Sequence, residues 1–301
     1  MNLSVNIGRM AMRNPVTVAS GTFGYGEEYA GLVDISKLGA ITVKGIRKEP
    51  CAGNPVPRIH EVPGGMLNAI GLQGPGARAF IEKYMPFLRE KNVPVIVNIW
   101  GTSLEGYAET AAEFEGVEGV DALELNVSCP NVKEGGATFG SDPALVAAVV
   151  AAVRKTAPSL TLITKLAPNV PDIKVFARAA EEAGSDALAI TNTIPAMAID
   201  IEARRPVLAN KFGGLSGAGI HPAAVKLVWD AAGAVHIPII GMGGIFTPAD
   251  AIEFLCAGAT AVAVGTANFI DPTTPLRVID GIADYMRRHG MSDVSEIRIA
   301  R

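Results

Sequence analysis

The 301-residue sequence has few cysteines, few histidines and no long apolar run. Cys51, Cys129 and Cys256 are far apart, so they indicate neither a disulfide framework nor a paired metal motif. The four histidines share no metal-ligand spacing, so we expect no metal site and interpret them as surface or satisfied structural groups. No stretch approaches the roughly 18 consecutive apolar residues of a membrane span. We therefore predict a protein without a metal centre or a membrane-spanning segment.

Basic clusters and targeting signals are also missing. The net charge is −4 and no basic block is present, which argues against a nucleic-acid surface. Residues 1–15 have neither a long apolar core nor a cleavage pattern, so we predict no signal peptide. These features favour a cytoplasmic protein that binds neither nucleic acid nor a membrane.

Short apolar runs alternate with helical patterns along the chain. Apolar runs bounded by turn residues predict buried strands. The helical patterns place apolar residues on one face, and several begin at a proline, which suits the first helical turn. The predicted strands are Val16–Ser20, Ala40–Lys44, Pro94–Ile99, Ala122–Asn126, Leu160–Leu166, Ala187–Thr191, Ile237–Gly241 and Ala259–Gly265. The predicted helices are Ala77–Lys91, Leu104–Phe114, Pro143–Lys155, Pro171–Ala183, Pro222–Ala232, Pro248–Ala257 and Pro275–Arg288, with Asp142 and Thr247 as caps of two of them.

Eight strands alternating with helices predict an α/β fold, a (β/α)8 TIM barrel in which residues 1–301 form a single domain. An open doubly wound sheet is the alternative. The barrel is favoured because the glycine-rich segments follow the last two strands, whereas a nucleotide-binding open sheet carries its glycines after the first. Residues 45–75 and 192–220 are long and rich in glycine and proline, so we expect two excursions over the carboxyl-end face.

Polar residues or glycines follow every predicted strand. In a barrel the carboxyl ends of the strands meet at one face, which carries the active site. The backbone N–H groups of glycines after the last two strands can bind a phosphate. Lys44 and Lys165 end two otherwise apolar strands, and a buried lysine requires a partner, so we expect an anionic ligand there. The asparagines Asn68, Asn126, Asn131 and Asn192 suit a ligand that presents N–H and C=O groups alternately.

The candidate for proton transfer is the thiol of Cys129. A lone cysteine is often a small packing residue. Cys129, however, follows a buried strand and lies between Asn126 and Asn131, and no Ser-His-Asp set or carboxylate pair stands at the strand ends. This setting favours a chemical role for the thiol.

The chain resembles the class 1 dihydroorotate dehydrogenases over essentially its whole length. The resemblance rests on motifs in the family's order: SGTFG, LNAIGLQGPG, NVSCPNVKEGG, KLAPN, TNT, GGLSG, GMGGI and VGTA. Val-Lys-Glu-Gly-Gly after Cys-Pro-Asn is most like subclass 1B, whose FMN-containing catalytic subunit passes electrons to NAD. The resemblance therefore implies FMN-dependent oxidation of (S)-dihydroorotate to orotate in pyrimidine (UMP) biosynthesis. It also implies a partner subunit with FAD and a 2Fe–2S cluster, and a homodimer core within a heterotetramer.

The same resemblance implies roles for individual residues. Cys129 would be the general base that removes the C5 proton, and N5 of FMN would accept hydride from C6. Orotate would be held by Lys44, Asn68, Ala69, Ile70, Gly71, Leu72, Asn126, Asn131, Asn192 and Thr193. FMN would be held by Ser20, Gly21, Lys44, Gly45, Asn98, Asn126, Lys165, Ile190, Gly217, Gly243, Gly244, Gly265 and Thr266. Trp100 departs from the expected pattern, because a smaller residue is expected near the flavin.

Two other hypotheses remain. A flavoprotein similar to dihydropyrimidine dehydrogenase would share much of this site, but its uracil-type substrate has no carboxylate for a cation to bind. A non-catalytic phosphate-ligand-binding barrel would explain the glycines, but it would leave Cys129 among amides without a role.

Overall fold

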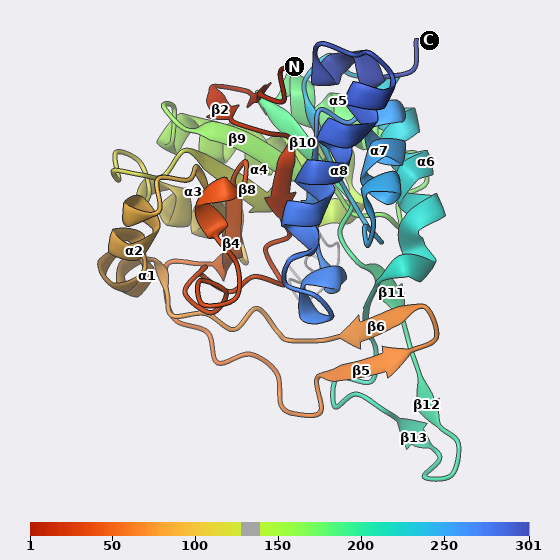
Figure 1. The fold of residues 1–301 in the computed structure, drawn as a ribbon. Helices are drawn as coiled ribbons and strands as arrows, with labels where there is room; N and C mark the ends of the chain where they lie inside the picture. Colours follow the sequence, from red (N-terminus) through yellow and green to blue (C-terminus); the bar gives the residue numbers. More distant parts are fainter. Residues whose placement is uncertain (128–138, 301) are drawn as a thin grey trace.

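The protein is described by a computed structural model over residues 1–127 and 139–300 (Figure 1). Eight parallel strands follow one another in the order β3-β16-β15-β10-β9-β8-β7-β4, and the Gly39 N–H donates to the Val16 carbonyl (2.8 Å) between the two end strands. Their bounds are β3 (Val16–Val18), β4 (Ile41–Ile46), β7 (Val95–Ile99), β8 (Ala122–Asn126), β9 (Thr161–Lys165), β10 (Ala187–Ile190), β15 (Ile239–Met242) and β16 (Ala261–Val264). The predicted (β/α)8 barrel is confirmed, and the open sheet is wrong.

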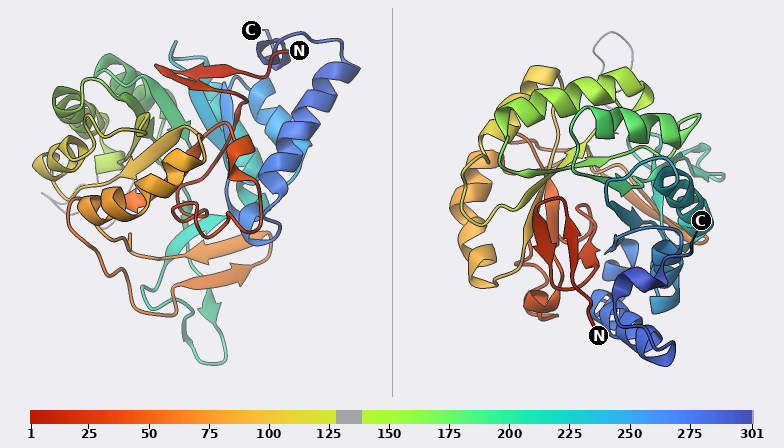
Figure 2. Two further views of the ribbon diagram at one scale, coloured as in Figure 1. Left: turned by 60° about the vertical axis from the view of Figure 1, so that its left-hand side comes forward. Right: turned by 90° about the horizontal axis from the view of Figure 1, so that it is seen from above.

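Helices surround the strands, as the view from above shows (Figure 2). The α-helices are α1 (Ala77–Lys83), α2 (Met85–Glu90), α3 (Leu104–Ala112), α4 (Pro143–Thr156), α5 (Ile173–Glu182), α6 (His221–Ala232), α7 (Pro248–Cys256) and α8 (Thr274–Arg288). Short 3-10 helices are η1 (Ile35–Lys37), η2 (Phe139–Ser141), η3 (Ala218–Ile220), η4 (Thr266–Phe269) and η5 (Val294–Ile297). Asp142 caps α4 and Thr247 caps α7, as predicted. Within the described residues, no helix has both the length and the apolar character that a membrane span requires.

Two helices differ from the prediction for local reasons. The predicted helix Ala77–Lys91 is interrupted at Tyr84, because Pro86 enters the first turn of α2 and has no N–H to continue the ladder of α1. Helix α5 begins at Ile173 instead of Pro171, because the Asp172 side chain accepts a hydrogen bond from the Lys174 N–H (3.0 Å) and caps the helix there.

The amino end of the barrel is closed by an apolar hairpin of β1 (Val5–Ile7) and β2 (Met10–Met12). Ile7, Met10 and Met12 are buried and pack against the inward-facing side chains of the strands. Several of these side chains are alanines, which leave room for the larger hairpin residues: Ala122, Ala187, Ala189, Ala261 and Ala263. This buried apolar surface fills the interior of the barrel at its amino end.

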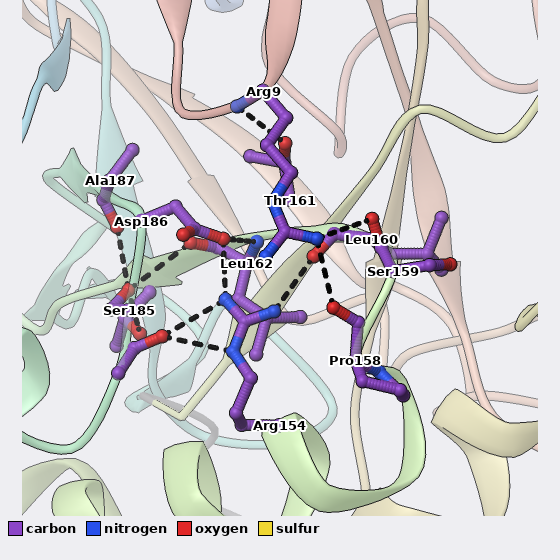
Figure 3. A network of polar contacts seen from close by, with 12 residues as sticks. Arg9, Arg154, Pro158, Ser159, Leu160, Thr161, Leu162, Ser185, Asp186 and Ala187 are labelled. Atoms are coloured by element: carbon purple, nitrogen blue, oxygen red, sulfur yellow. Dashed lines mark hydrogen bonds and ion pairs between the residues drawn. The ribbon is translucent and has the colours of Figure 1, made fainter.

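A polar network ties the same end together (Figure 3). The Arg154 guanidinium pairs with the Asp186 carboxylate and donates to the carbonyls of Gly184 (3.0 Å) and Leu160 (3.0 Å). Asp186 also accepts from the Leu162 N–H (2.8 Å). The network therefore joins α4 to the starts of β9 and β10.

The two predicted excursions are present and form one small sheet at the opposite end from the chain termini (Figure 1). Its strands are β5 (Ile59–Val62), β6 (Gly65–Asn68), β11 (Ile194–Ala196) and β14 (Gly213–Ser216), in the antiparallel order β11-β14-β6-β5. A second hairpin, β12 (Ile199–Asp200) and β13 (Arg205–Pro206), projects beyond it. Gly217 has φ of +115°, and a Cβ there would lie 2.5 Å from Gly65 Cα. Glycine at this position therefore allows the two excursions to join.

Candidate functional site

A cavity of about 400 Å³ lies at the carboxyl ends of the strands, between the barrel and the small sheet. Of the predicted site residues that the structure describes, all except Ile190 line it. They are Ser20, Gly21, Lys44, Gly45, Asn68, Ala69, Ile70, Gly71, Leu72, Asn98, Asn126, Lys165, Asn192, Thr193, Gly217, Gly243, Gly244, Gly265 and Thr266. The fold thus brings together residues from almost the whole length of the chain.

Of the other three predicted residues, one does not line the cavity and two lie outside the described residues. Ile190 is fully buried in the apolar layer between strands and helices, and its neighbour Thr191 lines the cavity. Cys129 and Asn131 lie outside the described residues. Asn126, at the end of β8 and just before them in the chain, lines the cavity.

Lys44 is a cation of the cavity without a carboxylate partner among the described residues. Within residues 1–127 and 139–300, its ammonium makes neither a hydrogen bond nor an ion pair. Burial, together with the nearby positive charges of Arg58 and Lys165, lowers the pKa of the Lys44 ammonium from its ordinary value. A bound anion would offset both the burial and the repulsion, so this part of the cavity is suited to a negatively charged group.

Lys165 has a carboxylate partner that sequence reasoning missed. Its ammonium lies 3.4 Å from Oε1 of Glu124, and the same oxygen accepts a hydrogen bond from Asn98 Nδ2 (2.5 Å). Glu124 is 2% exposed and lies in the middle of β8. A glutamate in the apolar run ALELN was the signal that could have identified it, because a buried carboxylate requires partners.

The segment after β15 forms a turn with free backbone donors. Gly243 and Gly244 have φ of +134° and +68°, and a Cβ on either would approach α6 within 2.7 Å. In the described part of the chain, the N–H groups of Gly243, Gly244 and Thr266 have no hydrogen-bond acceptor. The three residues line the cavity at the predicted phosphate position, and free N–H groups there suit a phosphate.

His221 supports this turn from behind. Its Nδ1 lies 3.0 Å from the Gly243 carbonyl oxygen, and its Nε2 lies 3.1 Å from Oε2 of Glu253 on α7. We predicted the histidines to be surface or satisfied structural groups, and His221 is buried with both ring nitrogens in hydrogen-bond contact. The contact fixes the carbonyl of Gly243 on the side away from a ligand.

Amide groups are clustered on another wall. Asn192 Nδ2 donates to Asn126 Oδ1 (3.2 Å), and the Tyr107 hydroxyl donates to the Asn126 carbonyl (2.7 Å). Asn68 Nδ2 donates to the Gly214 carbonyl (3.3 Å), which fixes it on the small sheet. These contacts order the amides in advance for a ligand with alternating donors and acceptors.

Trp100 lies behind the cavity wall. The Arg47 guanidinium covers its indole ring at 5.0 Å from the ring centroid. A Cβ on Gly45 would make only an ordinary contact with Trp100 Cδ1 (3.5 Å) but would lie 2.8 Å from Asn98 Oδ1, so the glycine makes room for Asn98. Across residues 1–127 and 139–300, no group of three or more His, Cys, Asp or Glu side chains is arranged to hold a metal ion.

Comparison with known proteins agrees with this geometry. The family profile described as dihydroorotate dehydrogenase matches residues 2–286. A protein of Trichlorobacter lovleyi is 54% identical over 295 residues, which cover 98% of this chain and 97% of the relative. One of Alkaliphilus metalliredigens is 53% identical over 298 residues, which cover 99% of this chain and 98% of the relative. Both relatives are named dihydroorotate dehydrogenase B (NAD(+)), catalytic subunit.

Proposed function

The chain belongs to the dihydroorotate dehydrogenase family, and we propose that it uses FMN to oxidise (S)-dihydroorotate to orotate in pyrimidine biosynthesis. The observation that carries the proposal is the cavity at the carboxyl ends of the strands. It combines free backbone donors, two lysines and a group of ordered amides. A phosphate-bearing flavin and an anionic pyrimidine require these three kinds of group.

The donor set fits FMN. The free N–H groups of Gly243, Gly244 and Thr266 would bind the phosphate, and Lys165 would face the flavin ring with Asn98 beside it. The other FMN-binding residues that we propose are Ser20, Gly21, Lys44, Gly45, Asn126, Gly217 and Gly265. Ile190 would contact FMN through its main chain, because its side chain is buried in the apolar layer and its neighbour Thr191 lines the cavity. When bound, FMN supplies the acceptor for the hydride that leaves C6 of the substrate.

The protein's own groups would bind the substrate and remove its proton. The Lys44 ammonium would bind the carboxylate, and Asn68, Asn126, Asn131 and Asn192 would hold the pyrimidine edge. Residues 69–72 and Thr193 would complete the substrate site. Cys129 Sγ would take the proton from C5, since a thiolate is a suitable base near neutral pH.

Electrons would leave through a partner. The name "catalytic subunit" of the relatives supports a second subunit, and "NAD(+)" in the same name supports the final acceptor. We propose that the partner carries FAD and a 2Fe–2S cluster, because three scattered cysteines in this chain cannot supply the four thiolates of most clusters. We further propose that the entire chain is one FMN-binding domain, and that it forms a homodimer core within a cytoplasmic heterotetramer.

The environment of Lys44 favours this reaction over uracil reduction. Lys44 has no carboxylate partner in the described chain, and Arg58 adds a second positive charge nearby. A uracil-type substrate is neutral and would leave both cations uncompensated. Dihydroorotate carries a carboxylate that can pair with them.

The test is anaerobic reduction of the purified, FMN-loaded chain, followed by the loss of flavin absorbance. Dihydroorotate should reduce the flavin rapidly, whereas dihydrouracil should reduce it slowly. A chain that binds FMN but is reduced equally by both compounds would contradict the proposed substrate. A chain that binds no FMN would contradict the proposed cofactor.

The partner is tested separately by steady-state turnover. The isolated chain should reduce an artificial dye with electrons from dihydroorotate but should reduce NAD poorly. Rapid NAD reduction by the isolated chain would contradict the need for a partner.

A further inference from the structure

Glu124 is a buried carboxylate that contacts two proposed flavin-binding residues without lining the cavity. Its Oε1 lies 3.4 Å from the Lys165 ammonium and 2.5 Å from Asn98 Nδ2. The three residues come from the neighbouring strands β7, β8 and β9, and Asn98 and Glu124 are register partners. A single oxygen atom therefore holds side chains from the two strands that flank β8.

A charge at this place is not needed to hold the strands together. The backbone ladder already pairs β7 with β8 and β8 with β9. Burying a carboxylate and an ammonium costs free energy that their mutual attraction often fails to recover, and apolar residues of similar size often stabilise a core equally well. We therefore look for the role of the Glu124 charge in its effect on the neighbouring cavity and not in the pairing of the strands.

The charges around the cavity can be counted from the contacts. Lys44 and Lys165 line it, and Arg58 adds positive charge near Lys44. Among the described residues, Glu124 forms an ion pair with Lys165, and Lys44 forms no ion pair. The charge of one lysine is thus offset and the charge of the other is not.

We propose that Glu124 is a positioning residue that lowers the reduction potential of the bound flavin. The proposal rests on the proposed function, because it requires FMN beside Lys165. Reduction adds two electrons and at least one proton to the flavin, and a nearby ammonium favours the negative charge that results. The Glu124 carboxylate offsets this effect of Lys165 while it holds the Lys165 and Asn98 side chains at the cavity wall. A lower potential favours onward transfer of electrons to a weakly oxidising acceptor such as NAD.

The test compares the wild-type chain with Glu124→Gln. Glutamine has nearly the same shape and can still accept from Asn98, but it has no charge. Spectroelectrochemical titration should give Glu124→Gln a more positive midpoint potential at pH 6.5. The ratio of reduced to oxidised flavin at a fixed dye potential should rise by about tenfold. Binding of FMN to the apoprotein, followed by flavin fluorescence, should change by less than about tenfold.

A second variant at an exposed site separates the effect of the buried charge from the effect of total charge. The matched control is Glu118→Gln, which removes a carboxylate that is 86% exposed and pairs with Arg89. Its potential should equal that of the wild type.

Equal midpoint potentials of the bound flavin in wild type and Glu124→Gln at pH 6.5 would overturn the inference and leave the proposed function intact. A wild-type chain that binds no FMN would instead overturn the proposed function. If Glu124→Gln does not fold, Glu124→Asp replaces it, because aspartate keeps the charge but withdraws it from Lys165. Its potential should shift in the same direction by a smaller amount, and a shift to more negative values would overturn the inference.

Discussion

The barrel has an ion pair at each end, and the two pairs differ in their exposure and in the number of additional hydrogen bonds that their side chains make. At the amino end, Arg154 and Asp186 are each about one quarter exposed, with side-chain exposures of 23% and 24%, and are surrounded by acceptors and donors of the backbone. At the carboxyl end, Lys165 and Glu124 are 7% and 2% exposed. Among the described residues, the polar contacts of the Lys165 ammonium are Glu124 (3.4 Å) and the more distant Ser20 hydroxyl (3.5 Å).

This difference separates a structural pair from a pair at a ligand site. The five donors of an arginine match several carbonyls at once, and at the amino end Arg154 uses them to join α4, β9 and β10. A lysine with few hydrogen-bond partners can still donate to a ligand. Within the described residues, the Lys44 ammonium has fewer polar partners than the Lys165 ammonium. Substitutions at the amino end should therefore change stability, and those at the carboxyl end should change binding and turnover.

The largest effect should come from Cys129→Ser at the carboxyl end. A hydroxyl is a far weaker proton acceptor than a thiolate, so flavin reduction by dihydroorotate at pH 7 should slow by about 10²–10⁴-fold. FMN content and the unfolding midpoint should stay near wild-type values. Stopped-flow absorbance measures the rate, and a rate near that of the wild type would remove Cys129 from the mechanism.

Asp186→Ala, at the amino end, should lower stability and leave FMN binding near the wild-type level. The substitution removes the carboxylate partner of the Arg154 guanidinium, which keeps only its backbone carbonyl acceptors among the described residues, and it leaves the Leu162 N–H without its Asp186 acceptor. We expect the free energy of unfolding to fall by about 2–3 kcal/mol, less than for a fully buried pair because this pair is partly exposed. Urea denaturation measures it. Asp284→Ala, at an exposed ion pair on α8, is the control and should change stability by less than about 1 kcal/mol. A loss of FMN without loss of stability in Asp186→Ala would contradict the division between the two ends.

Lys44→Met should weaken orotate binding by about 10–100-fold, since hydrogen bonds to charged groups contribute about 1.5–3 kcal/mol. Isothermal titration calorimetry on the FMN-loaded protein measures the affinity. Lys226→Met removes an exposed lysine paired with Asp230 and should bind orotate like the wild type. Unchanged affinity in Lys44→Met would show that the carboxylate is bound elsewhere.

The smallest effect should be the pH dependence of orotate binding. The Lys44 ammonium must be protonated to bind an anion, and burial and neighbouring cations lower its pKa. Affinity should therefore be fully present at low pH and decline as pH rises through that lowered pKa, below the usual range of lysine. This decline with rising pH is expected in the wild type and should be absent in Lys44→Met. A decline of equal size in both proteins would assign it to another group.

Residues of the candidate site could be predicted where a local sequence pattern, such as a polar residue at the end of an apolar strand, indicated them. Polar residues at strand ends, such as Lys44 and Lys165, could be placed at one face because parallel strands of a barrel end together. Glu124 was missed because it stands within an apolar strand run, and its partners Asn98 and Lys165 are on two other strands. His221 was seen only as a structural histidine, because its contact with Gly243 depends on how α6 packs against the turn after β15.

Local sequence determined the order of strands and helices, the caps at Asp142 and Thr247, and the positions of the glycine turns, because these features depend on near neighbours in the chain. Tertiary structure alone decided three features. The apolar hairpin of β1 and β2 fills the amino end, the two excursions combine into one sheet over the cavity, and a single carboxylate joins β7 to β9. Each of these contacts joins residues far apart in sequence, and its energy depends on burial and charge that exist only after the barrel has closed.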